Sequence, residues 1–334
     1  PQGVKIAELN SQARALMKAH HMPLRDKLIS QTTLMGKAMA PVAGLANAAL
    51  QARPIRALVE AAVGIHRQAP VPKSAGRPFH SWWKSRPLKT TPSPLGPVVF
   101  FHGCAGDYFE VETSIKSVEV LEHIGHQVIV PGQGCCGLAQ QSNGLYQEAS
   151  ANVIRLCRSL NQAGPELTII SSSGSCTGML KHEAREIMGV TDPALAAAST
   201  RVRDIMEHLL DLHHQGQLPR DLKPNPITVP YHAPCQLKGQ GMGMPALDVL
   251  RLIPELTVVE SGRACCGIAG TYGLKKEKYD VAQAVGRPLF DMITQTNPKL
   301  ALCDTETCRW QLRQGTGAQV EHPIWLIHKA YGLS

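Results

Sequence analysis

The sequence predicts a mixed α/β chain in which two tandem cysteine-rich modules, each with a small parallel sheet, are related by a pseudo-twofold axis. A helical basic segment precedes them. Three observations predict this: an internal repeat, strands that alternate with helices, and ten cysteines that all lie between Cys104 and Cys308. We expect the helical segment and a linker at 1–90, the first module at 91–219 and the second at 220–334.

The N-terminal segment is set apart by its charge. Residues 1–90 hold 14 Lys and Arg against 3 Asp and Glu, whereas the remainder of the chain holds 20 against 23. A basic segment of this kind favours contact with an anionic surface, while the acidic remainder argues against a nucleic-acid binder. Apolar residues recur at helical spacing between Leu28 and Val63, with Pro41 and Pro54 at expected helix starts. Residues 67–97, rich in proline, are expected to form an irregular linker.

Each module repeats the same three cysteine-bearing landmarks. The paired positions are Cys104 and Cys235, Cys135 and Cys265, and Cys176 and Cys308, at offsets of 131, 130 and 132 residues. A β-rich run such as VVFF at 98–101 precedes each landmark, and a stretch with helical spacing follows several of them. Strands that alternate with helices indicate a parallel sheet, and loops after the strand ends meet at one edge of such a sheet. The cysteines of one module should therefore converge.

Four thiolates per module satisfy the ligand requirement of a [4Fe–4S] cluster. The predicted ligands are Cys104, Cys135, Cys136 and Cys176 in the first module, and Cys235, Cys265, Cys266 and Cys308 in the second. A zinc ion would also accept four thiolates, although zinc sites more often use closely spaced cysteine pairs. We expect a cluster in the second module. A cluster, zinc or no metal all remain open for the first.

Two histidines lie close to landmark cysteines. His102 and His232 stand two and three residues before Cys104 and Cys235. They are candidates for hydrogen bonds that tune a bound cluster, and structural roles are an equal alternative. No residue is assigned a catalytic role.

The doubled C…CCG…C pattern resembles the CCG cysteine-rich domain of the heterodisulfide reductase B-subunit superfamily. Within it, the chain is similar to the C-subunit family of anaerobic glycerol-3-phosphate dehydrogenases. The matching segments are FFHGC at 100–104, CCG at 135–137, YHAPC at 231–235, CCGIAGTYGLKKEKY at 265–279, TETCRWQ at 305–311, EHPI at 321–324 and the run from Leu24 through Ser85. The resemblance spans almost the whole chain.

This resemblance implies an iron–sulfur electron-transfer subunit of a membrane-associated dehydrogenase complex. Electrons would come from a flavin subunit that oxidises glycerol-3-phosphate or a related hydroxy acid, and would pass toward quinone. The implied location is cytoplasmic, peripheral on the inner face of the cell membrane, in contact with anionic lipid. Because members of the family carry an N-terminal ferredoxin-like domain that ends in Cys-Pro, we expect Pro1 to follow such a domain, absent from this sequence.

The sequence departs from the superfamily pattern at one position of each module. Many members have a CxxC pair at the last landmark, where this chain has Ser173 and Thr305. Cys303 is a tentative substitute ligand in the second module, since residues two apart on an extended segment point to the same side.

Two other functions remain as alternatives. One is a heterodisulfide or thiol-disulfide reductase with its catalytic centre at a CCG site. The other is a zinc-bound or metal-free scaffold and membrane anchor. Metal analysis distinguishes the scaffold from the electron-transfer and reductase functions, because only these two need an iron–sulfur cluster.

Overall fold

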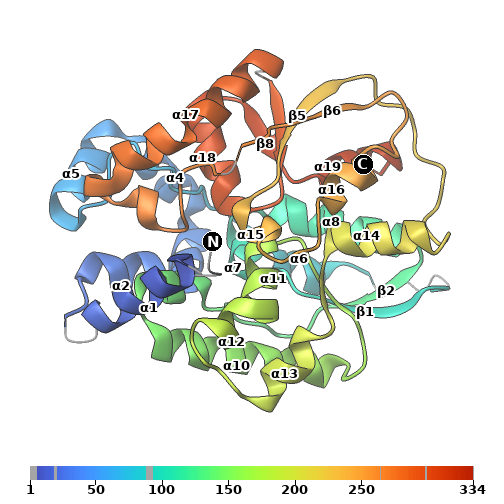
Figure 1. Ribbon diagram of the computed structural model, residues 1–334, viewed down its shortest axis with the longest axis horizontal. Coiled ribbons are helices and arrows are strands. Elements are labelled where there is room, and N and C mark those ends of the chain that lie inside the picture. Colours follow the sequence, from blue (N-terminus) through green and yellow to red (C-terminus); the bar gives the residue numbers. More distant parts are fainter. Residues whose placement is uncertain (1–5, 19–20, 88–92, 264, 298, 334) are drawn as a thin grey trace.

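The structure is a computed structural model that describes residues 6–18, 21–87, 93–263, 265–297 and 299–333. It contains two four-stranded parallel sheets with the same strand order, β2-β1-β3-β4 and β6-β5-β7-β8 (Figure 1). The predicted α/β class and the doubled architecture are therefore confirmed. The expectation about Pro1 and the predicted boundary at residue 90 lie outside the described residues. The boundary at 219/220 stays a prediction.

The first module surrounds the sheet of β1 (Gly96–Phe100), β2 (His126–Ile129), β3 (Ile169–Ser171) and β4 (Val202–Asp204). Its helices are α7 (Gly103–Tyr108), α8 (Val111–His123), α9 (Leu138–Asn143), α10 (Tyr146–Ala163), α11 (Gly174–Gly178), η2 (Met179–Glu183), α12 (Ala184–Glu186), α13 (Pro193–Ser199) and α14 (Ile205–His214). Strand β1 pairs with both β2 and β3, so the two loops that follow these neighbours open at the same sheet edge as its own.

The second module repeats this plan with β5 (Thr228–His232), β6 (Thr257–Glu260), β7 (Leu300–Cys303) and β8 (Gln319–Glu321). Its helices are α15 (Cys235–Lys238), α16 (Pro245–Leu250), η3 (Tyr272–Leu274), η4 (Lys276–Lys278), α17 (Tyr279–Thr296), α18 (Glu306–Thr316) and α19 (Ile324–Ala330). Strand β5 takes the central place of β1, between β6 and β7. The internal repeat in the sequence thus corresponds to a repeated fold.

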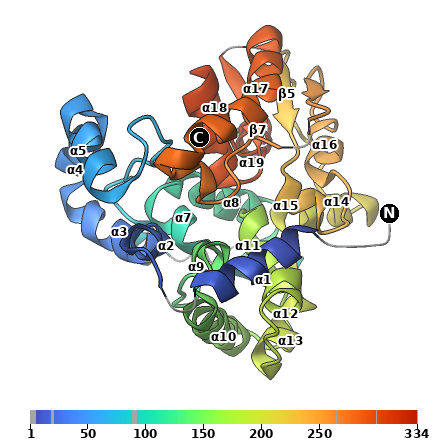
Figure 2. The same cartoon turned by 60° about the vertical axis from the view of Figure 1, so that its left-hand side comes forward.

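The N-terminal helices lie along one flank of the two modules (Figures 1 and 2). They are α1 (Ile6–Lys18), α2 (Leu24–Ser30), α3 (Thr32–Met39), η1 (Ala40–Val42), α4 (Ala43–Gln51) and α5 (Arg53–Val63). Pro41 and Pro54 stand in the first turns of η1 and α5, as expected. The expectation of an irregular linker at 67–97 is wrong in part, because α6 (Phe79–Ser85) forms there and the Phe79 side chain is fully buried.

One apolar core is shared by the two modules. It includes Phe100 and Leu121 from the first module together with Tyr231, Leu302 and Ile327 from the second. Helix α8 packs on α19, and α14 packs on α16. Each module also has a core of its own on the other face of its sheet. The two sheets therefore form one continuous structure around a common apolar layer.

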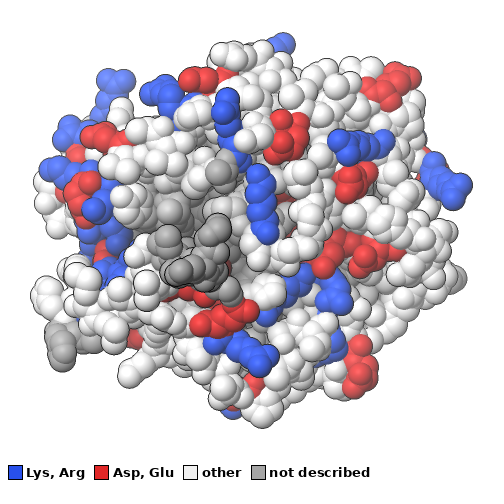
Figure 3. All heavy atoms as spheres, in the orientation of Figure 1, with Lys and Arg blue, Asp and Glu red and all other residues white. Residues whose placement is uncertain are grey.

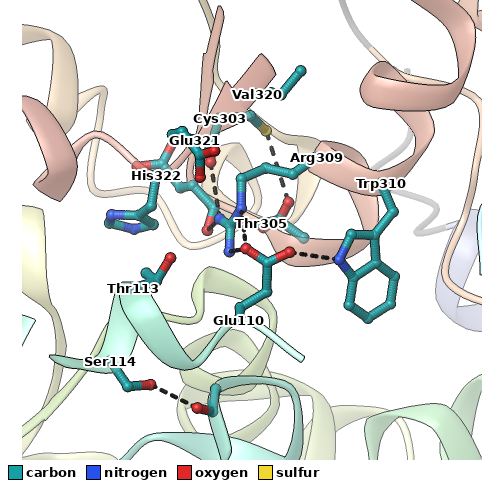
Figure 4. A network of polar contacts seen from close by, with 12 residues as sticks. Glu110, Thr113, Ser114, Cys303, Thr305, Arg309, Trp310, Val320, Glu321 and His322 are labelled. Carbon is teal, nitrogen blue, oxygen red and sulfur yellow. Dashed lines mark hydrogen bonds and ion pairs between the residues drawn. The ribbon is translucent and has the colours of Figure 1, made fainter. Parts of the chain in front are cut away.

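A buried ion pair crosses the same interface (Figure 4). Glu110, immediately before α8, accepts hydrogen bonds from Arg309 at 3.2 Å, from Trp310 at 2.7 Å and from Arg313 at 2.7 Å, all on α18. The Arg309 side chain is 1% exposed and also donates to the backbone carbonyls of Cys303 and Asp304. Burial acts to raise the pKa of Glu110, but Arg309 and Arg313 outweigh it, so the pKa lies below its usual value.

The glycine of each CCG motif permits a close packing of backbones. Gly267 has a φ of +88°, and a Cβ there would lie 1.9 Å from the carbonyl oxygen of Ala282 on α17. Gly137 has a φ of +85°, and a Cβ would lie 2.7 Å from the carbonyl oxygen of Ala149 on α10. A side chain at either position would be strained and would also push away the following long helix.

We predict that Glu110→Gln destabilises the fold by about 3–5 kcal/mol, because it leaves Arg309 buried without its counter-charge. The free energy of unfolding, measured in urea, should fall by that amount at pH 7. Because the folded-state pKa of Glu110 is lowered, its contribution is present above the unfolded value of 4.5 and is lost in more acidic solution. The difference in the free energy of unfolding between wild type and variant should therefore become smaller below pH 4.5. Glu112→Gln, at an exposed carboxylate in the first turn of α8, is the control and should change little.

We predict that Gly267→Ala costs substantially more stability than Gly262→Ala. Both glycines have positive φ, but a Cβ at Gly262 meets nothing within 4 Å. The control, Gly262→Ala, should lower the free energy of unfolding by about 1 kcal/mol through backbone strain alone. In Gly267→Ala the clash with α17 should add a further loss of about 1–3 kcal/mol. Thermal and urea unfolding of the two variants measure these losses. Equal losses would show that the approach of α17 does not constrain this turn.

Candidate metal centres

The loops after the strands bring the predicted cysteines of the first module together. Cys104 lies at the start of α7, Cys135 and Cys136 lie just before α9, and Cys176 lies in α11. The Sγ atoms of Cys135 and Cys104 are 3.6 Å apart, and those of Cys136 and Cys176 are 3.2 Å apart. The four thiols thus form two contacting pairs.

The second module repeats this arrangement. The Sγ atoms of Cys266 and Cys308 are 3.0 Å apart, and Cys235 lies near enough to Cys265 to lower the pKa of that thiol. Cys235 is exposed, Cys265 is partly exposed, and Cys266 and Cys308 are buried. The site is therefore open at one end and closed at the other.

The donor set fits a metal that prefers soft ligands, such as an iron–sulfur cluster or zinc. Zn–S bonds of about 2.3 Å in a tetrahedron place the sulfurs about 3.8 Å apart, which is wider than the measured thiol pairs. Among the described residues, no group of three His, Cys, Asp or Glu side chains is arranged so that it could hold one metal ion. A bound metal would therefore separate the paired thiols by rotation of their side chains.

The first cysteine of each CCG motif is the one that most readily becomes a thiolate. The neighbouring thiols of Cys104 and Cys136 hold the pKa of Cys135 well below its usual range. The pKa of Cys265 is lowered in the same way, first by the Cys235 thiol. Backbone N–H groups add to this, since Gly137 lies 3.4 Å from Cys135 Sγ and Gly267 lies 3.2 Å from Cys265 Sγ. Thiolate is the form that binds metal.

The candidate ligand Cys303 lies beside the second site. It ends β7, is fully buried, has its Sγ 4.0 Å from the carbonyl oxygen of Thr305, and contributes to the raised pKa of Cys308. Cys157, by contrast, is buried in the apolar core of the first module, where burial raises its pKa to about 12. Cys303 is thus within reach of the cysteine cluster, and Cys157 is not part of either set.

The two substituted CxxC positions lie at helix starts. Ser173 caps α11, where its Oγ accepts a hydrogen bond from the backbone N–H of Cys176. Thr305 stands at the start of α18, and its buried hydroxyl has no hydrogen-bond partner among the described residues. Ser173 therefore stabilises the start of the helix that carries Cys176, whereas the Thr305 side chain gives no such support to the helix that carries Cys308.

The two candidate histidines differ in their hydrogen bonding. The Nδ1 atom of His102 lies 2.7 Å from the carbonyl oxygen of Gly103, which is a purely local bond. The Nδ1 atom of His232 lies 3.1 Å from Ser261 Oγ, while its buried Nε2 has no partner in the described part of the chain. Burial, followed by Lys238, lowers the pKa of His232 to about 4, against an opposing effect of Cys265. His232 is thus neutral near pH 7 and lies close to the second site.

The two sites lie on helices that touch each other. Helix α11, which carries Cys176, packs on α15, which begins with Cys235. Gln240 donates from Nε2 to the carbonyl oxygen of Gly174 at 2.9 Å. A Cβ on Gly174 would lie 2.2 Å from Leu237 Cδ1, so a side chain here would displace Leu237. Both cysteine sets therefore face the interface between the modules.

Sequence reasoning missed a group of buried acids at this interface. Tyr231 donates to Asp304 at 2.8 Å, and Asp204 is fully buried with one free carboxylate oxygen. Burial, with a further contribution from Asp304, raises the pKa of Asp204 to about 8. Asp304 follows the β-rich run at 299–302, which is the signal that could have drawn attention to it, whereas Asp204 ends β4, a strand that the sequence did not predict. They bring a neutral, protonated carboxyl close to the module interface at pH 7.

Comparison with known proteins identifies the repeat. The family model described as "Cysteine-rich domain" (CCG) matches residues 98–181 and 229–313. The C subunit of the anaerobic glycerol-3-phosphate dehydrogenase of Escherichia coli is 35% identical over 99% of this chain and 83% of its own. The B subunit of the fumarate reductase (CoM/CoB) of Methanothermobacter marburgensis is 30% identical over 72% of this chain and 47% of its own. Lactate utilization protein A of Exiguobacterium is 24% identical over 71% of this chain and 96% of its own.

Both family matches fall within the two modules and include all eight predicted cysteine ligands. The N-terminal helices lie outside those two matches but within the region aligned with the Escherichia coli protein. The chain belongs to the CCG cysteine-rich domain family, in the branch that includes the C subunit of anaerobic glycerol-3-phosphate dehydrogenase.

Proposed function

We propose that this chain is an iron–sulfur electron-transfer subunit of a dehydrogenase complex. The observation that carries the proposal is the pairing of thiols at the sheet edge of each module, where α11 and α15 touch. The relatives support it, since the Escherichia coli protein is by name one component of a glycerol-3-phosphate dehydrogenase. When bound, a cluster of the [4Fe–4S] kind supplies reversible one-electron transfer.

The residues of the chain have three roles in this proposal. The cysteine thiolates hold the metal, and the CCG glycines direct backbone N–H groups at the ligand sulfurs. Hydrogen bonds to sulfur and exclusion of water both tune the reduction potential. The packing of α11 on α15 keeps the two sites at a fixed separation. Electrons would come from a flavin subunit that oxidises glycerol-3-phosphate or a related hydroxy acid, and would leave toward quinone.

A reductase function is the second candidate, and the exposure of Cys235 favours it. Catalysis on a disulfide needs a metal site that substrate can reach, and this end of the second site is open. Two cavities of about 590 and 320 Å³ are lined by other residues and contain none of the cysteines. Turnover of a disulfide substrate by the isolated, reduced protein would establish the reductase function.

We further propose that the chain binds peripherally to anionic lipid at the cytoplasmic face of the membrane. None of the described helices has the length and hydropathy of a membrane-spanning segment. The N-terminal helices expose large apolar side chains, namely Leu24, Leu34, Val42, Leu45 and Leu58. Lys and Arg gather on the same flank, interspersed with acidic residues (Figure 3). Apolar groups with basic neighbours are typical of interfacial binding.

The structure reduces the number of basic residues free for such contact. Arg56 is buried and donates to the backbone carbonyls of His66, Arg67 and Ala69. Arg25 is paired with Glu277 through two hydrogen bonds of 2.8 Å. Lys27, Lys37 and Arg53 remain exposed. The electrostatic attraction to lipid should therefore depend on these three.

We predict that anaerobically purified protein contains iron and sulfide in equal amounts, about four of each per occupied site. Cys235→Ser and Cys266→Ser should each remove the iron of the second site, measured by metal analysis and EPR. Cys157→Ala is the matched control, because that thiol lies in the apolar core, and it should keep all its iron. Cys104→Ser should reduce electron transfer less than Cys235→Ser. Zinc in place of iron would favour the scaffold function instead.

We predict that replacing Lys27, Lys37 and Arg53 by glutamine weakens co-sedimentation with anionic vesicles at least tenfold, since each basic residue contributes about 1 kcal/mol. The matched control replaces Arg220, Lys223 and Arg251, three exposed cations outside the N-terminal segment. Neither triple variant should affect sedimentation with neutral vesicles. If both lose binding to anionic vesicles equally, the net charge of the protein, and not the N-terminal face, causes the attraction.

A further inference from the structure

The cavity of about 320 Å³ opens beside the second sheet, where α8 of the first module packs on α19 of the second (Figure 1). Its lining combines residues of α8, β7, β8 and α19, so both modules contribute to it. None of the cysteines lines it, which separates it from the candidate metal sites. Its volume falls within the range of small-molecule sites in proteins.

The walls of this cavity are largely apolar. The apolar side chains that line it are Ile227, Leu300, Leu302, Trp325, Leu326 and Leu333. Leu300 and Leu302 stand two residues apart on β7 and therefore point to the same face of the sheet. Leu300, Ile227, Trp325 and Leu333 pack against the shared core but are only partly buried. An apolar ligand in the cavity would remove this remaining apolar surface from water, which is favourable.

The Trp325 ring is a wall of fixed position. Its Nε1 donates to Thr113 Oγ1 of α8 at 3.1 Å, and Nζ of Lys116, also on α8, lies 4.9 Å from the ring centroid. A cation above an aromatic ring is attracted by the negative charge of the ring face. Two contacts from the first module thus hold a side chain of the second, and the cavity is formed before any ligand enters.

Two lysines give the cavity a positive charge. Lys116 and Lys329 both line it, and neither forms an ion pair with a carboxylate in the part of the chain that the structure describes. Lys329 is exposed, and its only printed polar contact is a hydrogen bond of 3.3 Å to the amide oxygen of Asn225. Both ammonium groups are therefore available to an anionic ligand.

The acidic groups near the cavity are already paired. Glu321 also lines it, but its carboxylate accepts hydrogen bonds from Arg313 at 3.2 Å and from Gln319 at 3.1 Å. The carboxylate of Glu119 lies 2.6 Å from Nε2 of His328. Burial lowers the pKa of His328, so this ring is neutral at pH 7 and adds no charge of its own. The charge offered to a ligand is thus that of the two lysines.

We propose that this cavity binds a small anionic amphiphile, namely a carboxylate that carries a single alkyl chain. The chain would lie against Leu300, Leu302 and Leu326, and the carboxylate would pair with Lys116 and Lys329. The lysines would repel a cationic amphiphile, and a neutral one would gain only from the apolar walls. Because such a ligand contacts α8 and α19 together, its binding should also stabilise the folded chain.

The proposal makes a quantitative statement about chain length. Each methylene group buried against the apolar walls should tighten binding about fourfold, until the cavity is full. Octanoate should therefore bind about fifteenfold more tightly than hexanoate. Loss of one lysine charge should weaken binding about two- to fivefold, the usual range for ion pairs with access to solvent.

The test is isothermal titration calorimetry of the full chain with hexanoate, octanoate, octanol and octylammonium, with thermal unfolding in octanoate as a second readout. Octanoate should bind saturably and raise the unfolding temperature, and octanol and octylammonium should bind more weakly. Leu300→Trp, which extends a partly buried side chain into the cavity, should abolish the saturable binding. Lys116→Gln and Lys329→Gln should each weaken it. Lys299→Gln is the matched control, because this exposed lysine precedes β7 and does not line the cavity.

Three results would overturn the proposal. They are octanoate binding that is equal in the wild type, Leu300→Trp and both lysine variants, octylammonium binding as tight as that of octanoate, and no saturable binding of octanoate to the wild type. If Leu300→Trp does not fold, the two lysine variants and the comparison of hexanoate with octanoate decide. Iron content and electron transfer are not involved in these measurements, so the proposed function stands or falls separately.

Discussion

The placement of both cysteine sites depends on one buried ion pair between the modules. Glu110 ends the loop before α8, and the Arg309 guanidinium reaches it from the helix that also carries Cys308. A buried charge without its partner is so unfavourable that the two modules have to keep this relative orientation. The apolar core shared by both sheets acts in the same direction. The ion pair defines the orientation, and the apolar contacts provide the bulk of the stabilisation.

This arrangement has a consequence for electron transfer. Each cysteine set lies at the carboxyl edge of its own sheet, and the module interface brings α11 and α15 into contact. Two metal sites built in this way are held at a constant distance by rigid helices. Under the proposed function, the chain would need no large movement for an electron to pass from one site to the other. The open end of the second site, at Cys235, is the natural place for exchange with a partner.

The repeat made much of the fold predictable. Constant offsets between cysteines, with a β-rich run before each, were sufficient to predict two parallel sheets with thiols at one edge. This repeated pattern of a β-rich run followed by cysteine could not indicate which side chains form contacts between the two modules. Arg309 stands next to Cys308 in the sequence, yet its partner Glu110 lies about two hundred residues away in the other module. The burial of Arg56 was also invisible, because its basic charge predicts exposure and only the fold reveals the carbonyl oxygens that surround it.

Anomalous X-ray diffraction from anaerobically grown crystals, measured on both sides of the iron edge and of the zinc edge, tests the central claim most directly. The account predicts an iron peak within bonding distance of the sulfurs of Cys235, Cys265, Cys266 and Cys308, and an iron peak in the first module as well if that site is loaded. A zinc peak at the second site, or an iron peak that any one of these four sulfurs does not reach, would contradict it.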